Sequence, residues 1–249
     1  MAATTPAPPT TVPFPPNLTF EPVTPETLKQ WVTLTNTVFG TPYPNGDPPF
    51  LSVFYPNGIT PPVAAWSLSM HTDALPKDHE NYAVVRDESQ PDRPVIATAR
   101  WTYTPATTAA EREKANKEAQ AARLEDAQGT PVPGIAYDVF EVWRPAQAGG
   151  QARVMGDLAH VYLKILAVRS DWQGKGVGKA LLRHVCDWSA QRGLPVYLES
   201  SPAGVPVYLK TGFEDKGYID WDARKLGHKS AFKHLAMVWY PKETDNAHK

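Results

Sequence analysis

The chain has 249 residues, enough to bury a substantial core in one large domain or two small ones. Its 25 Lys and Arg residues against 26 Asp and Glu residues give a formal net charge of −1, so bulk charge does not favour nucleic acid or an anionic membrane as a partner. A single cysteine, Cys186, excludes an internal disulfide and a thiolate-rich metal site. We find neither a membrane-spanning apolar run nor the apolar core of a secretory signal, and we therefore expect a cytoplasmic protein.

Proline is concentrated toward the N-terminus. Six of the 26 prolines fall within the first 16 residues, and seven more lie within residues 41–62. Because each ring fixes φ and removes a hydrogen-bond donor, we expect residues 1–19 to form a proline-rich tail or a strap over the surface. Between the two clusters, Thr24 and Pro25 predict a helix start, and the spacing of apolar residues indicates an amphipathic helix over 25–39.

The next segment is predicted to form a helix and a β-hairpin. Residues 63–74 fit a helix, residues 82–87 alternate briefly, and residues 95–103 alternate more clearly. The residues predicted to share one side of the last strand are Val95, Ala97, Ala99, Trp101 and Tyr103.

A charged insertion follows over residues 105–158. Thr108 and Glu111 are spaced as a capping box, and the residues after them are nearly all charged, polar or alanine, which predicts a largely solvated helix. Residues 126–136 are expected to be a Gly/Pro loop. The aromatic content of residues 137–142 fits a strand or a helix equally well, so we leave that segment open.

The pattern is clearest from His160 onward. An apolar strand over 160–168 precedes a glycine-rich turn and a helix that ends at Gly193. The predicted inner face of that helix is Val177, Leu181, Leu182, Val185 and Trp188. The remaining predicted elements are strands at 195–199, 214–219 and 234–240, a short helix at 205–211, and a C-terminal tail at 242–249.

The glycine-rich segment 173–179 lies where an anion is readily bound, because the first N–H groups of a helix are unpaired and the helix dipole is positive there. Two common phosphate-binding patterns do not fit it. The G-x-x-x-x-G-K-[ST] loop would need glycine in place of Gln173 and a hydroxyl in place of Ala180. A G-x-G-x-x-G loop would need glycine in place of Lys179 or Leu181.

The segment fits Q-x-x-G-x-G instead, spelled by Gln173, Gly176 and Gly178 directly after a strand that ends L-A-V. Here the sequence resembles the GNAT superfamily of acyl-CoA-dependent N-acetyltransferases, from about residue 160 through the Y-x-x-x-G-F motif that begins at Tyr208. The combination of H-x-Y-L-x-x-L-x-V with E-x-S-P-A-G is similar to fungal members. The resemblance implies an α/β fold: one domain over 20–241 with a central mixed, mostly antiparallel sheet flanked by helices.

The resemblance also implies acetyl-CoA as the cosubstrate. The spacings of the seven histidines give no support for a metal site, so we expect none. Backbone amides across the glycine-rich segment would bind the pyrophosphate, and the preceding strand edge would meet the pantetheine arm. Its Val168 N–H would polarise the thioester carbonyl, an interaction worth about 3 kcal/mol in acyl transfer. The residues so assigned are Leu166, Ala167, Val168, Gln173, Gly174, Lys175, Gly176, Val177, Gly178 and Lys179.

Acyl transfer to an amine requires two proton movements. Tyr208 matches the family's general-acid tyrosine, which protonates the coenzyme A thiolate; the alternative is an ordinary core tyrosine. Glu199, at a strand end beside the predicted opening between the central strands, is our first choice for the base, although a turn or cap role is equally consistent. His160 and Tyr162 are weaker candidates. Cys186 fits a small buried hydrophobe, so we expect direct transfer in a ternary complex.

We therefore expect an enzyme that transfers an acetyl group from acetyl-CoA to a primary amine of a small molecule, with no nucleic-acid or membrane partner. Segments 41–62 and 105–158 are expected to shape the acceptor site or its lid. Two alternatives stay open at this point. The acceptor is a protein N-terminus or lysine in the first, and the chain is an inactive CoA-binding module in the second.

Overall fold

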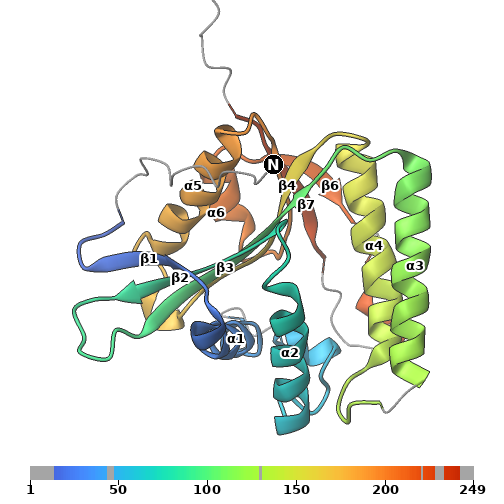
Figure 1. The fold of residues 1–249 in the computed structure, drawn as a ribbon, viewed down its shortest axis with the longest axis horizontal. Helices are drawn as coiled ribbons and strands as arrows, with labels where there is room; N and C mark the ends of the chain where they lie inside the picture. Colours follow the sequence, from blue (N-terminus) through green and yellow to red (C-terminus); the bar gives the residue numbers. More distant parts are fainter. Residues whose placement is uncertain (1–13, 44–47, 129–130, 220, 228–232, 242–249) are drawn as a thin grey trace, which may run out of the picture.

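A seven-stranded sheet runs through the centre of the molecule (Figure 1). The structure is a computed structural model, and it describes residues 14–43, 48–128, 131–219, 221–227 and 233–241. The strands are β1 (Leu18–Pro22), β2 (Glu80–Asp87), β3 (Val95–Thr104), β4 (His160–Val168), β5 (Val196–Ser200), β6 (Glu214–Tyr218) and β7 (Leu235–Trp239). Their order in the sheet is β1-β2-β3-β4-β5-β7-β6, and each neighbouring pair is antiparallel except β4 and β5. The predicted mixed, mostly antiparallel sheet is confirmed.

Helices cover both faces of this sheet (Figure 1). They are α1 (Pro25–Phe39), α2 (Pro61–Ala74), α3 (Ala109–Gln128), α4 (Tyr137–Met155), α5 (Val177–Ala190) and α6 (Val205–Lys210), with short 3-10 turns η1 (Phe50–Val53), η2 (Ser170–Trp172) and η3 (Ala223–Leu226). One face carries α5 and α6. On the other face, α1 packs over β2 to β4 and α4 packs over β5 and β7. The exposed helix α3 lies against α4, which confirms the predicted solvated helix.

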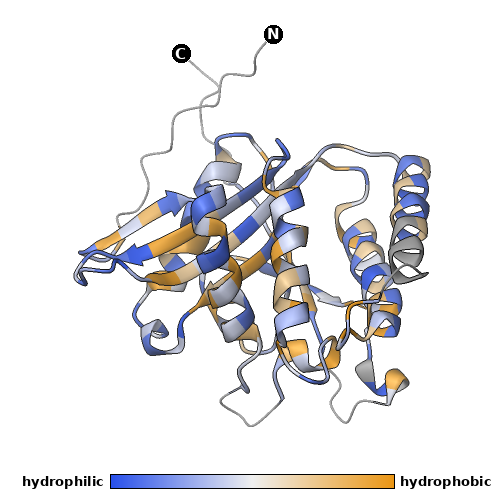
Figure 2. Ribbon diagram, turned by 60° about the horizontal axis from the view of Figure 1, so that its bottom comes forward, coloured by the Kyte–Doolittle hydropathy of each residue, from blue (hydrophilic) through white to orange (hydrophobic). Residues whose placement is uncertain are grey.

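The hydrophobic core is divided between the two faces. The strands and the inner faces of the helices carry most of the hydrophobic residues, whereas α3 is mainly hydrophilic (Figure 2). Helix α5 buries Val177, Leu181, Leu182 and Val185 as predicted, and the fifth predicted residue, Trp188, is partly buried against the same core. On the opposite face, the fully buried Trp31 of α1 donates its indole N–H to the Ala99 carbonyl at 3.1 Å.

The predicted shared side of β3 is wrong at Val95. Ala97, Ala99 and Trp101 do pack with α5. Val95, however, packs against the α1 cluster on the other face. Tyr103, near the other end of the strand, is 38% exposed. In the pairing with β2, Val85 is opposite Ala97 and Arg86 is opposite Val95, so β3 has one extra residue between them. This bulge places Val95 on the opposite face from Ala97.

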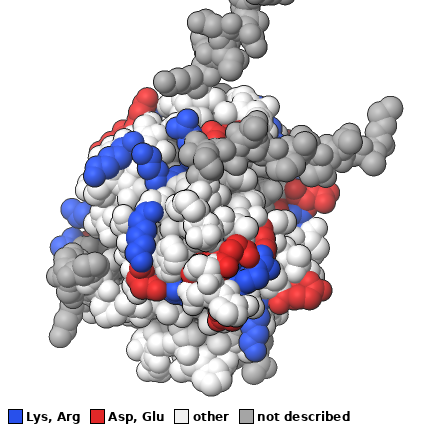
Figure 3. All heavy atoms as spheres, turned by 90° about the vertical axis from the view of Figure 1, so that its left-hand side faces the viewer, with Lys and Arg blue, Asp and Glu red and all other residues white. Residues whose placement is uncertain are grey.

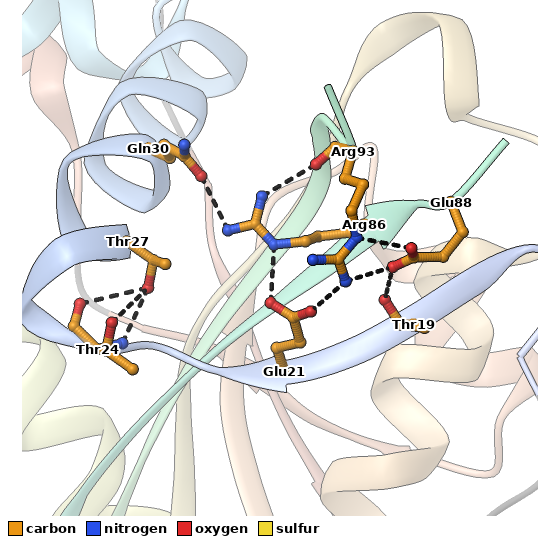
Figure 4. A network of polar contacts seen from close by, with 8 residues as sticks. All are labelled: Thr19, Glu21, Thr24, Thr27, Gln30, Arg86, Glu88 and Arg93. Atoms are coloured by element: carbon orange, nitrogen blue, oxygen red, sulfur yellow. Dashed lines mark hydrogen bonds and ion pairs between the residues drawn. The ribbon is translucent and has the colours of Figure 1, made fainter. Parts of the chain in front are cut away.

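The last residues of the predicted proline-rich tail belong to the sheet, as strand β1. A polar network fastens this edge strand (Figure 4). The buried Arg86 donates its Nε to Glu21 of β1 at 2.8 Å and its Nη2 to Gln30 of α1 at 2.9 Å. Arg93 bridges Glu21 and Glu88 at 2.6 Å. Elsewhere on this side of the molecule, basic and acidic residues are interspersed, as the near-zero net charge predicts (Figure 3).

The segment that the sequence left open, 137–142, forms the first turns of α4. The α4 rings pack on rings from the proline-rich stretch: Phe50 lies 5.4 Å from Trp143, and Phe54 lies 4.8 Å from Phe140, between ring centroids. These four residues form an aromatic layer over β5 and β7. Segments 41–62 and 105–158, which carry no family motif, therefore pack on each other.

Candidate active site

The two central parallel strands separate soon after they begin. β4 and β5 pair only through Val161 with Val196 and Tyr162 with Tyr197. Although β4 is the middle strand of the sheet, its first four residues are buried and most of the residues from Lys164 onward are not. Unpaired strand edges expose N–H and C=O groups that need partners, so this separation is a natural place for an extended ligand.

Backbone groups at the end of β4 face the separation. The Arg169 N–H donates to the Ile96 carbonyl of β3 at 2.9 Å. Because such groups alternate along a strand, Val168 directs its N–H and C=O away from β3, and the Val168 carbonyl accepts a bond from Gln173 Nε2 at 3.0 Å. The same alternation turns Leu166 toward the open side, whereas Ala167 faces β3.

The glycine-rich loop follows β4 and leads into α5. Gly174 and Gly176 have φ values of 75° and 85°, a region that glycine adopts easily, and a Cβ at either position would meet no atom within 4 Å. A Cβ on Gly178 would lie 3.3 Å from Val168 Cγ2, so α5 starts close against β4. Within the described part of the chain, the N–H groups of residues 174–179 make no backbone hydrogen bond. These amides at a helix N-terminus fit an anion such as a diphosphate.

The side chains around this loop are engaged elsewhere. The Lys175 ammonium lies 4.8 Å from the centroid of the Trp172 ring. Arg183 forms a 3.4 Å ion pair with Asp187 one turn along α5. The backbone amides, more than the basic side chains, are therefore the groups with unused hydrogen-bonding capacity.

Glu199 lies two residues beyond the last β5 residue that pairs with β4. Its carboxylate accepts hydrogen bonds from the hydroxyls of Tyr162 and Tyr197, the latter at 2.8 Å, and Gln147 of α4 donates to the Tyr162 oxygen at 3.0 Å. Burial raises the pKa of Glu199 to about 7, against the tyrosine hydrogen bonds and the Arg144 charge, which favour the carboxylate. Near neutral pH this group can therefore both accept and release a proton.

The two weaker base candidates have other tasks. His160 donates from Nδ1 to the Leu158 carbonyl at 2.7 Å and contacts Gln151 Nε2 through Nε2 at 2.7 Å, so both ring nitrogens are occupied, and burial lowers its pKa. Tyr162 is held as a donor to Glu199, and burial raises its pKa. His160 is thus a satisfied structural group, and Tyr162 orients Glu199.

Tyr208 lies on the opposite face of the sheet, in α6. Its ring packs edge-on against Phe213 at 5.5 Å between centroids and against the core beneath α5. Gly204 makes room for it, because a Cβ there would lie 2.9 Å from Tyr208 Cε2. Burial raises the pKa of the phenol, and its hydroxyl bonds to none of the described residues. The fully buried Cys186 nearby has its pKa raised to about 12 by burial, so its thiol stays protonated.

The comparisons with known proteins agree with this geometry. Residues 95–213 match the acetyltransferase (GNAT) family, a span that contains the loop, Glu199 and Tyr208. The chain contains a GNAT acetyltransferase domain. No curated protein matches the sequence. The predicted family and enzyme class are confirmed, and acetyltransferases of this family use acetyl-CoA.

Solved GNAT structures share the fold over nearly the whole chain. A mosquito arylalkylamine N-acetyltransferase-like protein (5b) is 16% identical with a TM-score of 0.59, over 90% of this chain and 99% of that one. A Corynebacterium glutamicum structure described as histone acetyltransferase HPA2 and related acetyltransferase is 21% identical, with a TM-score of 0.56 over 92% and 99%. Arabidopsis thaliana NAA60, solved with a bisubstrate analogue, is 13% identical, with a TM-score of 0.52 over 91% and 99%.

Sequence reasoning missed two residues around Glu199 in this GNAT domain. Tyr197 could have been found from its i, i+2 spacing to Glu199 on one strand. Gln147 could not, because it comes from α4, which the sequence left undecided. A cavity of about 570 Å³ between α1 and α2 is lined by none of the predicted site residues.

Among the residues described here, no three His, Cys, Asp or Glu side chains are grouped as a metal site. None of the described helices is long and apolar enough to cross a membrane.

Proposed function

We propose that this GNAT acetyltransferase moves an acetyl group from acetyl-CoA to a primary amine of a small molecule in one direct step. The observation that carries the proposal is the separation of β4 and β5, with Glu199 beside it on one face and Tyr208 on the other. The free amides of 174–179 fit the pyrophosphate of coenzyme A. The open edge at Leu166 and Val168 fits the pantetheine arm, and the Val168 N–H is suited to polarise the thioester carbonyl.

The residues supply both proton movements that the reaction needs. An alkylamine with a pKa of about 10.4 is protonated at pH 7, and exposing its lone pair costs roughly 4 to 5 kcal/mol. Glu199 accepts that proton, because a pKa of about 7 leaves much of it as carboxylate at neutral pH. As the N–C bond forms and the C–S bond breaks, the nitrogen gives up its second proton to solvent and the Tyr208 hydroxyl donates a proton to the departing sulfur. The tyrosinate then regains a proton from solvent. Acetyl-CoA supplies the acetyl group and the thiolate.

The aromatic layer supports a small acceptor. Its rings from η1 and α4 cover the sheet on the side of β5 where Glu199 lies, while α1 and α2 cover the side of β2 and β3. The approach to Glu199 is therefore bordered by packed elements on two sides, which suits a small molecule better than an extended chain.

The test is a screen of small amines with acetyl-CoA, in which released thiol and the mass of the acetylated product are measured. Glu199→Gln and Tyr208→Phe should both lower kcat/KM while coenzyme A still raises the Tm, since neither side chain is assigned to cofactor binding. Unchanged turnover in both variants would contradict the proposed mechanism. Binding of coenzyme A without any thiol release would favour the inactive CoA-binding module.

A further inference from the structure

A charged cluster from three neighbouring strands lies on the same face as Glu199. Glu80 of β2 accepts a hydrogen bond from Arg100 Nε of β3 at 2.8 Å and another from Lys164 Nζ of β4 at 3.0 Å. The Glu80 side chain is only 5% exposed, whereas that of Lys164 is 30% exposed. The Glu80 carboxylate is thus the buried member of the cluster, and Lys164 is more accessible to solvent.

The cluster borders the candidate active site. Lys164 Nζ lies 5.8 Å from the centroid of the Tyr162 ring, and the Tyr162 hydroxyl donates to Glu199. The register of β3 with β4 shifts at this point: Arg100 pairs with the residue after Lys164 and Trp101 with the residue before it. Lys164 therefore occupies a bulge on the strand that separates from β5, and bulges of this kind commonly re-aim a side chain beside an active site.

The cluster carries more positive charge than its own carboxylate neutralises. One Glu80 balances two cations, and Arg144 of α4 lies near enough to lower the pKa values of both Lys164 and Glu199. Burial opposes the ionisation of Glu80, but the hydrogen bonds and charges of the two cations hold its pKa at about 2.

Of the other described titratable groups near Lys164, Glu199 lies beyond the Tyr162 ring and is partly ionised at pH 7, whereas the histidine and the tyrosines are neutral. Burial, reinforced by Arg100, lowers the pKa of Lys164 to about 8, so it is mostly protonated at pH 7. From α2, the facing His71 is neutral at that pH, because burial lowers its pKa to about 4. Tyr82 and Tyr162 are neutral phenols whose pKa values are raised by burial.

Lys164 and Arg100 both have N–H groups that can donate hydrogen bonds to a ligand. Of the three N–H groups of the Lys164 ammonium, one is engaged with a protein oxygen in the described part of the chain. Arg100 uses only its Nε in this way and stacks over the Tyr82 ring at 5.1 Å. An anionic ligand would satisfy these donors, a neutral one would leave them to water, and a second ammonium group would be repelled.

We propose that the acceptor amine carries an anionic group, a carboxylate or a phosphate, which Lys164 and Arg100 bind while the amine faces Glu199. This assignment rests on the proposed function. It names the class of acceptor and makes Lys164 the residue that determines it.

The experiment compares acceptors that share a scaffold and differ only in one group. One set is β-alanine, β-alaninamide and 1,3-diaminopropane; a second is 3-(aminomethyl)benzoate with its amide; a third is 2-aminoethyl phosphate with ethanolamine. We expect the anionic member of the best-used set to have the highest kcat/KM, by at least about tenfold, equal to 1.4 kcal/mol. Comparison of the preference in the two carboxylate sets with that in the phosphate set shows which anionic group the site binds. A neutral or dicationic amine as the best acceptor would overturn the assignment.

Variants of Lys164 separate this inference from the proposed function. Lys164→Met should abolish the preference for the anionic member, Lys164→Arg should retain it, and Lys117→Met on the exposed α3 should behave as wild type. In the wild type the ratio of kcat/KM values should fall as pH rises through about 8, where Lys164 loses its proton, but not in Lys164→Arg. Titration of Glu199 affects all acceptors alike and cancels in the ratio. A preference that survives Lys164→Met would overturn the assignment, whereas no thiol release from any amine would refute the proposed function itself.

Discussion

Removal of one hydroxyl should shift the pH at which Glu199 becomes active. Tyr162→Phe deletes a donor to the Glu199 carboxylate and leaves the buried ring in place. A hydrogen bond to a charged group contributes about 1.5 to 3 kcal/mol, and one pKa unit corresponds to about 1.4 kcal/mol. Since the lost bond favours the charged form, the pKa of Glu199 should rise from about 7 by roughly one to two units.

The assay is the pH dependence of kcat/KM for thiol release. A base must be deprotonated, so activity rises with pH through the pKa of Glu199, and this acidic limb should move upward in Tyr162→Phe. Activity at pH 7 should therefore fall by roughly 5- to 50-fold and recover at higher pH. Tyr218→Phe, at a 60% exposed tyrosine on β6, is the matched control, and it reports the titration of the acceptor itself. An equal loss at every pH, with the limb unmoved, would refute the reasoning.

Three further predictions concern the loop, the thiol and the aromatic layer. Gly176→Ala and Gly193→Ala both place a Cβ at positive φ, and each should lower the free energy of unfolding in urea by about 1 to 2 kcal/mol. Only Gly176→Ala should weaken coenzyme A binding, by about tenfold in calorimetry. Equal affinities of the two variants would argue against pyrophosphate binding by the glycine-rich loop. Cys186→Ala should retain acetyl transfer, because the buried thiol stays protonated; loss of turnover in a folded variant would favour an acyl-enzyme. Trp143→Ala should lower the free energy of unfolding by about 3 to 5 kcal/mol, and a value under 1 kcal/mol would show that the layer contributes little.

Features with local causes could be predicted from the sequence. The helix start at Thr24 and Pro25, the glycine-rich turn and the inner face of α5 depend on residues a few positions apart, and the structure has all three. The family resemblance also depended on short motifs around Gly176 and Tyr208. These patterns can be recognised in the sequence because each of these elements follows local spacing and capping rules that agree with the overall fold.

Features that depend on tertiary contacts could not be predicted. The bulge in β3 exists only in relation to the neighbouring strand β2, so strict alternation misplaced Val95. Helix α4 is specified by packing of its aromatic residues on η1, and its own periodicity is weak. The charged cluster joins Glu80 to Lys164, 84 residues apart in sequence, and no local pattern links them.

The account depends most on the loop at the start of α5, and a crystal structure of the protein with coenzyme A tests it directly. We expect the pyrophosphate oxygens to accept hydrogen bonds from N–H groups of residues 174–179. We expect the pantetheine arm to lie along β4, with the sulfur in the separation between β4 and β5. A coenzyme A bound elsewhere, with those amides facing only solvent, would contradict the assignment of the site.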